Sequence, residues 1–224
     1  MKVVIYTGAG ISYDSGVPLF EDKDSVFSKY PLEIVAYKDG WKKNWQLFKS
    51  FMDELEKSFT CKEIKPNQTH YLLSQWEKEN EDEFTIITTN IDDLHEQAGS
   101  KNVIHVHGNI KQKRKLPNGH NIPNCVLFGE NKNFIYECNK IIKRSDVFVC
   151  VGSSLSTGDD NLLNLAIESG SKTFEINPVT TFYSNKFDFS IRKKGHDGLK
   201  EIYNMMKKFN KPTPKINSNH ILQI

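Results

Sequence analysis

The stretch Lys2-Val3-Val4-Ile5-Tyr6-Thr7-Gly8-Ala9-Gly10-Ile11-Ser12 decides how the rest of the chain is interpreted. Its first half is rich in β-branched residues and suits a buried strand. Its second half is a turn of small residues, which lets the phosphates of a ligand approach the backbone and reach amide groups at a helix N-terminus. An ordinary tight turn after an edge strand also fits. The full dinucleotide fingerprint is absent, because only Gly8 and Gly10 match its first two glycines and Tyr13 stands at the third.

The composition indicates a globular protein without a strong charge bias. The 224 residues suit one sizeable domain with room for a small inserted module. Lys and Arg number 30 and Asp and Glu 28, so the net charge of +2 gives no electrostatic argument for binding nucleic acid or a membrane. No apolar run approaches the roughly 18 residues of a membrane helix. The N-terminus lacks a secretory pattern, so we expect a cytoplasmic location.

The cysteine pattern argues against both a disulfide framework and a metal site. The four cysteines, Cys61, Cys125, Cys138 and Cys150, form no C-x-x-C pair. Cys125 and Cys150 lie in apolar, strand-like runs, and Cys138 lies on the apolar side of an expected helix. We therefore expect free, buried thiols.

Strand-like and helix-like segments alternate along the chain. Short, continuous apolar runs predict strands at 2–6, 84–88, 102–106, 125–128, 146–151 and 173–176, with an edge strand at 187–191. Helical stripes or starts predict helices at 43–57, from 66 into 77–83, from 92 or 93 to 99, and at 134–142, 162–170 and 199–209. A basic loop at 111–123 and a tail at 210–224 complete the chain. This order predicts an α/β fold, a Rossmann-like parallel sheet with helices on both faces.

The residues that follow the predicted strands form a coherent set. In open parallel sheets, ligands bind beyond the carboxyl ends of the strands. Here these ends carry small, polar or ionisable residues, namely Gly8-Ala9-Gly10, Asn90-Ile91-Asp92, His107-Gly108, Gly129-Glu130, Gly152-Ser153-Ser154 and Asn177. Six such ends predict a ligand cleft, although any one of them alone would be weak evidence.

This set of motifs resembles the sirtuins, which are NAD-dependent protein deacylases. The resemblance rests on the following stretches, which occur in the order of that family and span about residues 3–191: Gly8-Ala9-Gly10-Ile11-Ser12 with Ser15-Gly16-Val17-Pro18-Leu19-Phe20, Pro66-Asn67-Gln68-Thr69-His70, Asn90-Ile91-Asp92-Asp93-Leu94-His95 with Ala98-Gly99, His107-Gly108, Phe128-Gly129-Glu130, Gly152-Ser153-Ser154-Leu155 and Ile176-Asn177. It implies one catalytic domain over 1–224, with a small helical module at about 24–65. It also implies NAD as cosubstrate and an acyl-lysine protein or peptide as partner.

The resemblance assigns catalytic roles to three residues. His107 matches the histidine that removes a ribose hydroxyl proton, a task suited to imidazole because its pKa lies near the working pH. Asn90 matches the residue that positions the nicotinamide ribose and a water molecule. Asp92 matches the residue that holds the nicotinamide carboxamide. The alternatives are a structural histidine, a turn asparagine and a helix N-cap.

Further residues are expected to bind the cofactor. The alternative for Ser153 and Ser154 is the N-cap of the next helix. The alternative for Phe20 and Phe128 is a place in the core. Phe128 would otherwise form a wall beside the acyl group. His105 would either support the site from behind or belong to the core. The expected cofactor-binding residues are Gly8, Ala9, Gly10, Ile11, Phe20, Thr89, Ile91, Gly152, Ser153, Ser154 and Asn177.

The chain departs from the family pattern at three places. Glu21 and Thr89 stand where the family has Arg and Gln. The zinc module that usually follows the His-Gly pair is replaced by a short loop, 109–123. Structural zinc needs about four Cys or His ligands, and His120 and Cys125 cannot supply them, so we expect no metal.

Three functions remain open on the sequence. The first is lysine deacylation, in which the nicotinamide–ribose bond of NAD is cleaved and the acyl group passes to ADP-ribose. The second is NAD hydrolysis or ADP-ribosyl transfer, which the departures from the family favour. The third is a non-catalytic NAD sensor, against which the retained His107 and Asn90 argue. The sequence leaves the acyl group and the oligomeric state open.

Overall fold

The computed structural model describes residues 1–60, 63–80, 83–156 and 158–209. The predictions for Cys61 and for the tail at 210–224 fall outside these residues.

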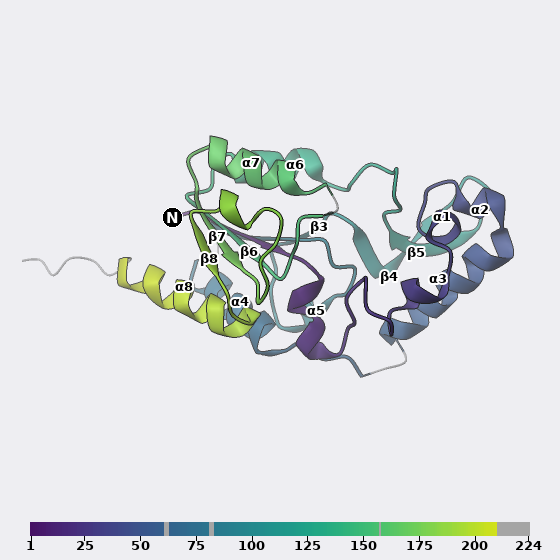
Figure 1. Ribbon diagram of the computed structural model, residues 1–224, viewed down its shortest axis with the longest axis horizontal. Helices are drawn as coiled ribbons and strands as arrows, with labels where there is room; N and C mark the ends of the chain where they lie inside the picture. Colours follow the sequence, from purple (N-terminus) through teal and green to yellow (C-terminus); the bar gives the residue numbers. More distant parts are fainter. Residues whose placement is uncertain (61–62, 81–82, 157, 210–224) are drawn as a thin grey trace, which may run out of the picture.

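A six-stranded sheet forms the centre of the molecule (Figure 1). The strands are β1 (Val3–Thr7), β2 (Phe84–Thr88), β3 (Val103–His105), β6 (Val147–Val151), β7 (Lys172–Ile176) and β8 (Phe189–Ile191). Their order is β3-β2-β1-β6-β7-β8, and every neighbouring pair is parallel. The predicted α/β fold is therefore confirmed, including the edge strand β8 within the predicted range 187–191. Because β1 lies between β2 and β6, the turn after it does not follow an edge strand.

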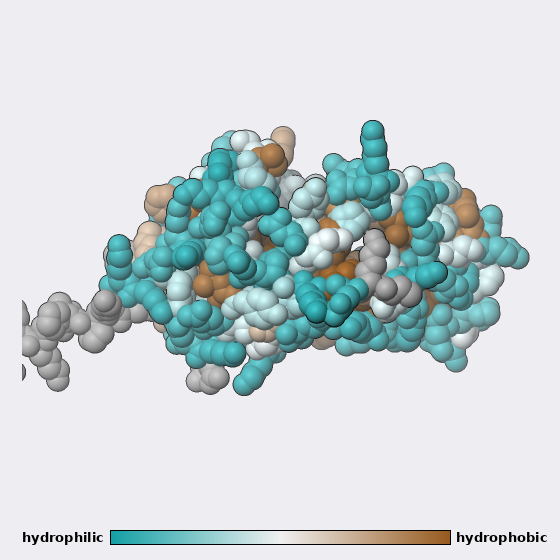
Figure 2. All heavy atoms as spheres, turned by 90° about the horizontal axis from the view of Figure 1, so that it is seen from below, coloured by the Kyte–Doolittle hydropathy of each residue, from teal (hydrophilic) through white to brown (hydrophobic). Residues whose placement is uncertain are grey.

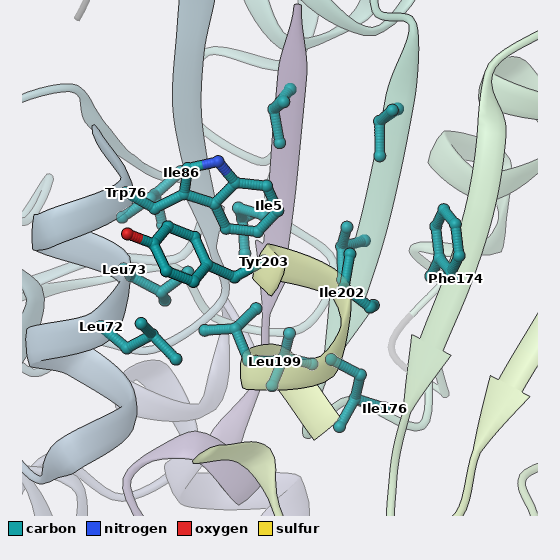
Figure 3. Close-up of a cluster of buried hydrophobic side chains, with 14 of the residues drawn as sticks. Ile5, Leu72, Leu73, Trp76, Ile86, Phe174, Ile176, Leu199, Ile202 and Tyr203 are labelled. Atoms are coloured by element: carbon teal, nitrogen blue, oxygen red, sulfur yellow. The ribbon is translucent and has the colours of Figure 1, made fainter. Parts of the chain in front are cut away.

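Side-chain alternation along the strands builds one core on each face of the sheet. Val3 and Ile5 point to one face and Val4 and Tyr6 to the other, and all four are buried. The first face is covered by α4 (Gln68–Lys78) and α8 (Gly195–Phe209), and the second by α6 (Ile135–Ile142) and α7 (Asp160–Glu168). Figure 3 shows the first core, in which Trp76 and Tyr203 from the two helices pack against Ile5 and Ile86.

A third core lies at the opposite end of the molecule from the sheet (Figure 1). The helical part consists of η3 (Val26–Lys29), α1 (Leu32–Val35), α2 (Gly40–Lys43) and α3 (Trp45–Thr60). An antiparallel hairpin of β4 (Gly108–Lys115) and β5 (Asn121–Cys125) packs against it. The remaining short elements are η1 (Ala9–Ile11), η2 (Tyr13–Ser15), α5 (Leu94–Gln97) and η5 (Ser184–Lys186).

The hairpin corrects two sequence predictions. The segment 109–123 is not a loop, and 125–128 is not a strand of the main sheet, because Cys125 ends β5. The lysines of β4 face solvent, whereas Ile110 and Ile122 enter the third core. This one-sided burial explains why a strongly basic stretch still forms strands. Pro123 is tolerated because the two-stranded sheet consists only of edge strands.

The described cysteines agree with the prediction of free thiols. Cys125, Cys138 and Cys150 are buried and unpaired. Burial raises the pKa of the Cys125 and Cys138 thiols to about 11, so both stay protonated at neutral pH. Within the described ranges, no helix is long and apolar enough to cross a membrane.

Candidate functional site

The carboxyl ends of the central strands are tied directly to one another. The Thr89 amide donates to the Thr7 carbonyl at 3.0 Å, which joins the ends of β2 and β1. The Gly8 amide donates to the Val151 carbonyl at 3.2 Å, which joins the ends of β1 and β6. The Gly152 amide donates to Ile176 at 3.0 Å, which adds β7. The ends of β1, β2, β6 and β7 therefore form one continuous edge, whereas Gly129 and Glu130 do not end a strand of this sheet, contrary to the prediction.

The glycines at this edge are required by the close approach of two backbones. A Cβ on Gly10 would lie 2.8 Å from the Gly152 Cα, and one on Gly8 would lie 2.7 Å from the Ser153 Cβ. Gly152 has a φ of +63°, and a Cβ there would lie 2.6 Å from the Ile11 nitrogen. The Gly10 amide itself donates to the Gly152 carbonyl at 2.8 Å. The small residues thus shape the turn through its own packing, in addition to any ligand they admit.

The helix expected after this turn is replaced by two single 3-10 turns, η1 and η2. They are anchored by Asn67, which begins α4 through a capping bond to the Thr69 amide at 2.9 Å. The Asn67 side chain also donates to the Ile11 carbonyl at 2.8 Å and to Ser15 Oγ at 3.0 Å. The Pro66–His70 motif therefore starts a helix, as predicted, and also holds the glycine turn in place.

Ser12 connects the two predicted catalytic residues of the segment after β2. Its buried hydroxyl donates to Asp92 Oδ2 at 2.9 Å and accepts from Asn90 Nδ2 at 3.0 Å. The sequence placed Ser12 in a motif but gave it no role. Asp92 Oδ1 also accepts the Leu94 amide at 3.2 Å, but the N-cap residue of α5 is Asp93, so the alternative that Asp92 is the N-cap is wrong. Burial raises the pKa of Asp92, although the bonds from Leu94 and Ser12 oppose this shift.

Asn90 is fixed at both its side chain and its backbone. Its Nδ2 also donates to the Gly8 carbonyl at 3.1 Å. Its carbonyl lies 2.8 Å from His105 Nδ1, and His105 Nε2 lies 2.8 Å from Glu96. Burial alone would lower the pKa of His105, but the bonds to Glu96 and Asn90 raise it above its ordinary value. His105 therefore supports Asn90 from behind, as one of the two interpretations expected.

His107 occupies the turn between β3 and β4 and is half-buried. The Val106 amide donates to the Thr88 carbonyl at 3.0 Å, which places the neighbouring His107 at the same edge as Asn90. Burial lowers the pKa of His107 below its ordinary value, and the charge of Lys132 adds to this shift. Asp159 and the Thr89 backbone oppose it. The imidazole is therefore neutral at pH 7 and able to accept a proton.

The serines after β6 do not cap the following helix, because α7 begins only at Asp160. Instead, Ser153 Oγ accepts the Leu155 amide at 3.1 Å within its own loop, and Ser154 lies 2.8 Å from Ser156. Asn177 Nδ2 donates to the Ser153 carbonyl at 3.3 Å. The ends of β6 and β7 are thus joined through side chains as well as backbone.

Aromatic side chains mark the boundary between the sheet edge and the third core. The Phe20 and Phe27 rings lie 4.5 Å apart, and the Phe128 ring lies 6.3 Å from Phe20 and 5.4 Å from Tyr37. Phe20 and Phe128 are 40% and 42% exposed, so the alternative that they are core residues is wrong. Glu21, where the family has Arg, is exposed.

A hollow of about 470 Å³ lies behind the Phe-Gly-Glu segment, lined by Lys38, Arg114, Asn124 and Glu130 among others. Arg114 donates two bonds to Glu130, at 2.9 and 2.8 Å. None of the predicted catalytic residues lines it.

The face seen in Figure 2 is mainly hydrophilic, with hydrophobic atoms visible between polar side chains. Among the residues that the structure describes, no group of three or more His, Cys, Asp or Glu side chains is placed to hold a metal ion.

Comparisons with known proteins agree with this geometry. A family model described as "Sir2 family" matches residues 8–122. An NAD-dependent protein deacylase of Pasteurella multocida is 30% identical over 84% of this chain and 90% of its own. The structure of a Sir2 homologue in complex with NAD superposes with a TM-score of 0.78 at 28% identity, covering 93% of this chain and 90% of that one. A Sir2 complex with an inhibitor, 2′-O-acetyl-ADP-ribose and a deacetylated p53 peptide has a TM-score of 0.75 at 25% identity, covering 92% and 94%.

Proposed function

This chain belongs to the Sir2 family, and from that premise we propose that it is an NAD-dependent protein lysine deacylase. The observation that carries the proposal is the link between Asn90 and Asp92 through Ser12 at the sheet edge, where burial lowers the pKa of His107 so that the imidazole can act as a base. A protein that only binds NAD has no need for a general base at this position. The similar proteins that are named as deacylases, and the one solved with NAD, support the same conclusion.

The residues at the strand ends fit NAD by their chemistry. Gly8, Gly10 and Gly152 let the ends of β1 and β6 pack closely together, and we expect the turn that they build to bind the pyrophosphate through its backbone. Ser153, Ser154 and Asn177 offer hydroxyl and amide groups to the adenosine ribose. Ala9, Ile11, Thr89 and Ile91 would line the path to the nicotinamide, with Phe20 as the cover against water.

Three residues would perform the chemistry. When bound, NAD supplies an electrophilic ribose carbon and nicotinamide as the leaving group. Asp92 would hold the carboxamide of that leaving group through its carboxylate. Asn90 would orient the ribose and a water molecule. His107 would take the proton of a ribose hydroxyl as general base, so that this oxygen can attack the acyl carbon as the nucleophile.

Two further features belong to the proposal. We expect an acyl-lysine protein as substrate, with Phe128 beside the acyl group at the exposed aromatic boundary. We also expect a protein without structural zinc, since the hairpin of β4 and β5 stands in the place of the zinc module and is held by Ile110 and Ile122 in the third core. A cytoplasmic location and the small helical module at 24–65 remain predictions.

The test is nicotinamide release from NAD, measured with and without an acetyl-lysine peptide. We expect release only when the peptide is present. Release without peptide would favour NAD hydrolysis, and no release with acetyl-, succinyl- and longer acyl peptides would contradict both enzymatic functions.

The variant His107→Ala tests the role of the base. We expect a loss of acyl transfer of at least about 100-fold, while NAD binding measured by calorimetry stays within a few-fold of the unmodified protein. His120→Gln, which changes an imidazole outside the site, is the matched control. An unchanged rate in His107→Ala would contradict the assignment.

A further inference from the structure

Lys132 is held next to the proposed general base by the path of the backbone. The chain leaves the His107 turn through the hairpin and then returns to it twice. The Val126 amide donates to the His107 carbonyl at 2.8 Å, and the Asn133 amide donates to the Val106 carbonyl at 2.9 Å. Lys132, the residue before Asn133, therefore lies beside this turn.

Asp159 approaches the same place from a different segment. It is the N-cap residue of α7, and its side chain is only 1% exposed. Its carboxylate forms an ion pair with the Lys132 ammonium, which is 21% exposed. A carboxylate buried to this extent is costly unless it is paired. The ion pair therefore joins the segment after Phe-Gly-Glu to the loop after β6.

The two charges act on His107 in opposite directions. The Asp159 carboxylate raises the pKa of His107, and the Lys132 ammonium lowers it. The Thr89 backbone, after the end of β2, also raises the pKa of His107. Tyr6, from β1, stays un-ionised beside Asp159, because burial first and then that charge raise its pKa. In the part of the chain that the structure describes, the ionised groups acting on His107 are thus the two members of one pair.

This inference rests on the proposed function. We propose that Lys132 and Asp159 are positioning residues for His107, which balance the charge at the imidazole and join the two segments that flank it. With the pair intact, the two charges oppose each other at His107, and burial remains the largest influence on its pKa. When one partner is neutralised, the charge of the other acts alone in a half-buried environment, where screening is weaker than in water.

The test is an NMR titration of the His107 imidazole in the full, ligand-free chain, with the signal assigned by its absence in His107→Gln. Asp159→Asn leaves the lysine charge, so the His107 titration should move to lower pH, by about 0.5 to 1 unit. Lys132→Met leaves the carboxylate, so it should move to higher pH by a similar amount. The double variant should titrate close to the unmodified protein. Asp160→Asn removes the neighbouring carboxylate of α7 and should leave the titration in place.

The proposal would be overturned if Asp159→Asn and Lys132→Met moved the His107 titration in the same direction, or if neither moved it. It would also be overturned if Asp160→Asn moved the titration as far as Asp159→Asn does. If Lys132→Met does not fold, Asp159→Asn and the double variant still decide, because the double variant must titrate higher than the single one. The low-pH limb of kcat/KM for the acetyl-lysine peptide should move with the NMR titration. If the two single variants move the NMR titration in opposite directions but kcat/KM does not follow, the proposed action of the ion pair on His107 stands and the role of His107 as the base is contradicted. Failure of this inference and failure of the proposed function are therefore distinguishable.

Discussion

At the scale of single residues, Ser12 holds two of the proposed catalytic residues in place. Its hydroxyl is the shared partner of Asp92 and Asn90, and it lies in the turn that approaches Gly152. Removing it leaves a buried carboxylate oxygen and a buried amide short of one partner each. Such groups cost free energy because they have already lost their water.

Ser12→Ala is therefore expected to lower the free energy of unfolding by about 1 to 3 kcal/mol and to raise the KM for NAD. Urea unfolding and steady-state kinetics measure the two effects. Ser15→Ala is the matched control, because Asn67 loses one bond there but keeps its bond to the Ile11 carbonyl at 2.8 Å. Equal effects of the two variants would contradict the role given to Ser12.

His70 and His95 form a second residue-scale feature below the site. Their rings lie 5.0 Å apart, both are fully buried, and His95 Nε2 lies 2.9 Å from Thr7 Oγ1. Burial lowers the pKa of His70 from 6.5 to about 4. Burial also places the pKa of His95 well below its ordinary value. Both imidazoles are therefore neutral in the folded protein at neutral pH.

This pair predicts a loss of stability in acid. Above pH 6.5 neither the folded nor the unfolded state protonates His70, so its contribution is fully present. As the pH falls towards 4, the unfolded state binds the proton and the folded state does not, which costs on the order of 3 kcal/mol. Urea unfolding of His70→Gln between pH 7 and pH 4.5 should show a flatter pH dependence. His120→Gln should keep the steep one, and equal slopes would contradict the explanation.

The sequence predicted the residues whose positions follow from the sheet. The positions of His107, Asn90 and Asp92 were predicted because parallel strands place their carboxyl ends at one edge, whereas their catalytic roles came from the resemblance and remain predictions. Ser12 was missed because its partner Asp92 lies 80 positions away, and the bond between them depends on side-chain geometry. The Lys132–Asp159 pair was missed for the same reason, since neither residue belongs to a recognisable motif.

At the scale of elements, α8 shows how closely the helices fit the sheet. A Cβ on Gly198 would lie 2.4 Å from Ile176 Cγ2, a branched side chain with little freedom to move. Alanine would favour the helix by about 1 kcal/mol, but overpacking at a buried contact costs about 1 to 3 kcal/mol. Gly198→Ala is therefore expected to be destabilising on balance.

Thermal unfolding measures this prediction, and Gly195→Ala in the same helix is its control. A Cβ on Gly195 would come no nearer than 3.3 Å to Thr69, so we expect a change close to zero. A more stable Gly198→Ala would show that the helix moves away from the sheet at little cost.

Strand prediction succeeded for β2, which is buried on both faces, and failed for the hairpin of β4 and β5, which is buried on one. The run 84–88 matches β2 residue for residue, because both faces of the strand are apolar. The sequence predicts a loop where β4 and β5 form a hairpin, because few of its residues, Ile110, Ile122 and Cys125, enter the third core and most of the others are polar or basic. Its partners on α3 lie far away in the sequence, so local patterns do not indicate it.

At the scale of the whole molecule, the sheet edge and the exposed aromatic boundary lie next to each other. Ile110 donates its amide to the Ile91 carbonyl at 2.8 Å, which joins the hairpin to the segment that carries Asn90 and Asp92. Phe20 follows the glycine turn in the chain and contacts Phe128 across the boundary. The proposed cosubstrate site and the proposed acyl-lysine site therefore meet near His107, as a reaction between the two substrates requires.

The measurement that tests this account most directly is mass spectrometry of the products formed from NAD and an acetyl-lysine peptide. We predict nicotinamide, deacetylated peptide and O-acetyl-ADP-ribose in equal amounts, with none of the three formed by His107→Ala. Free ADP-ribose together with a peptide that remains acetylated would contradict the account, because NAD would then be cleaved without acyl transfer.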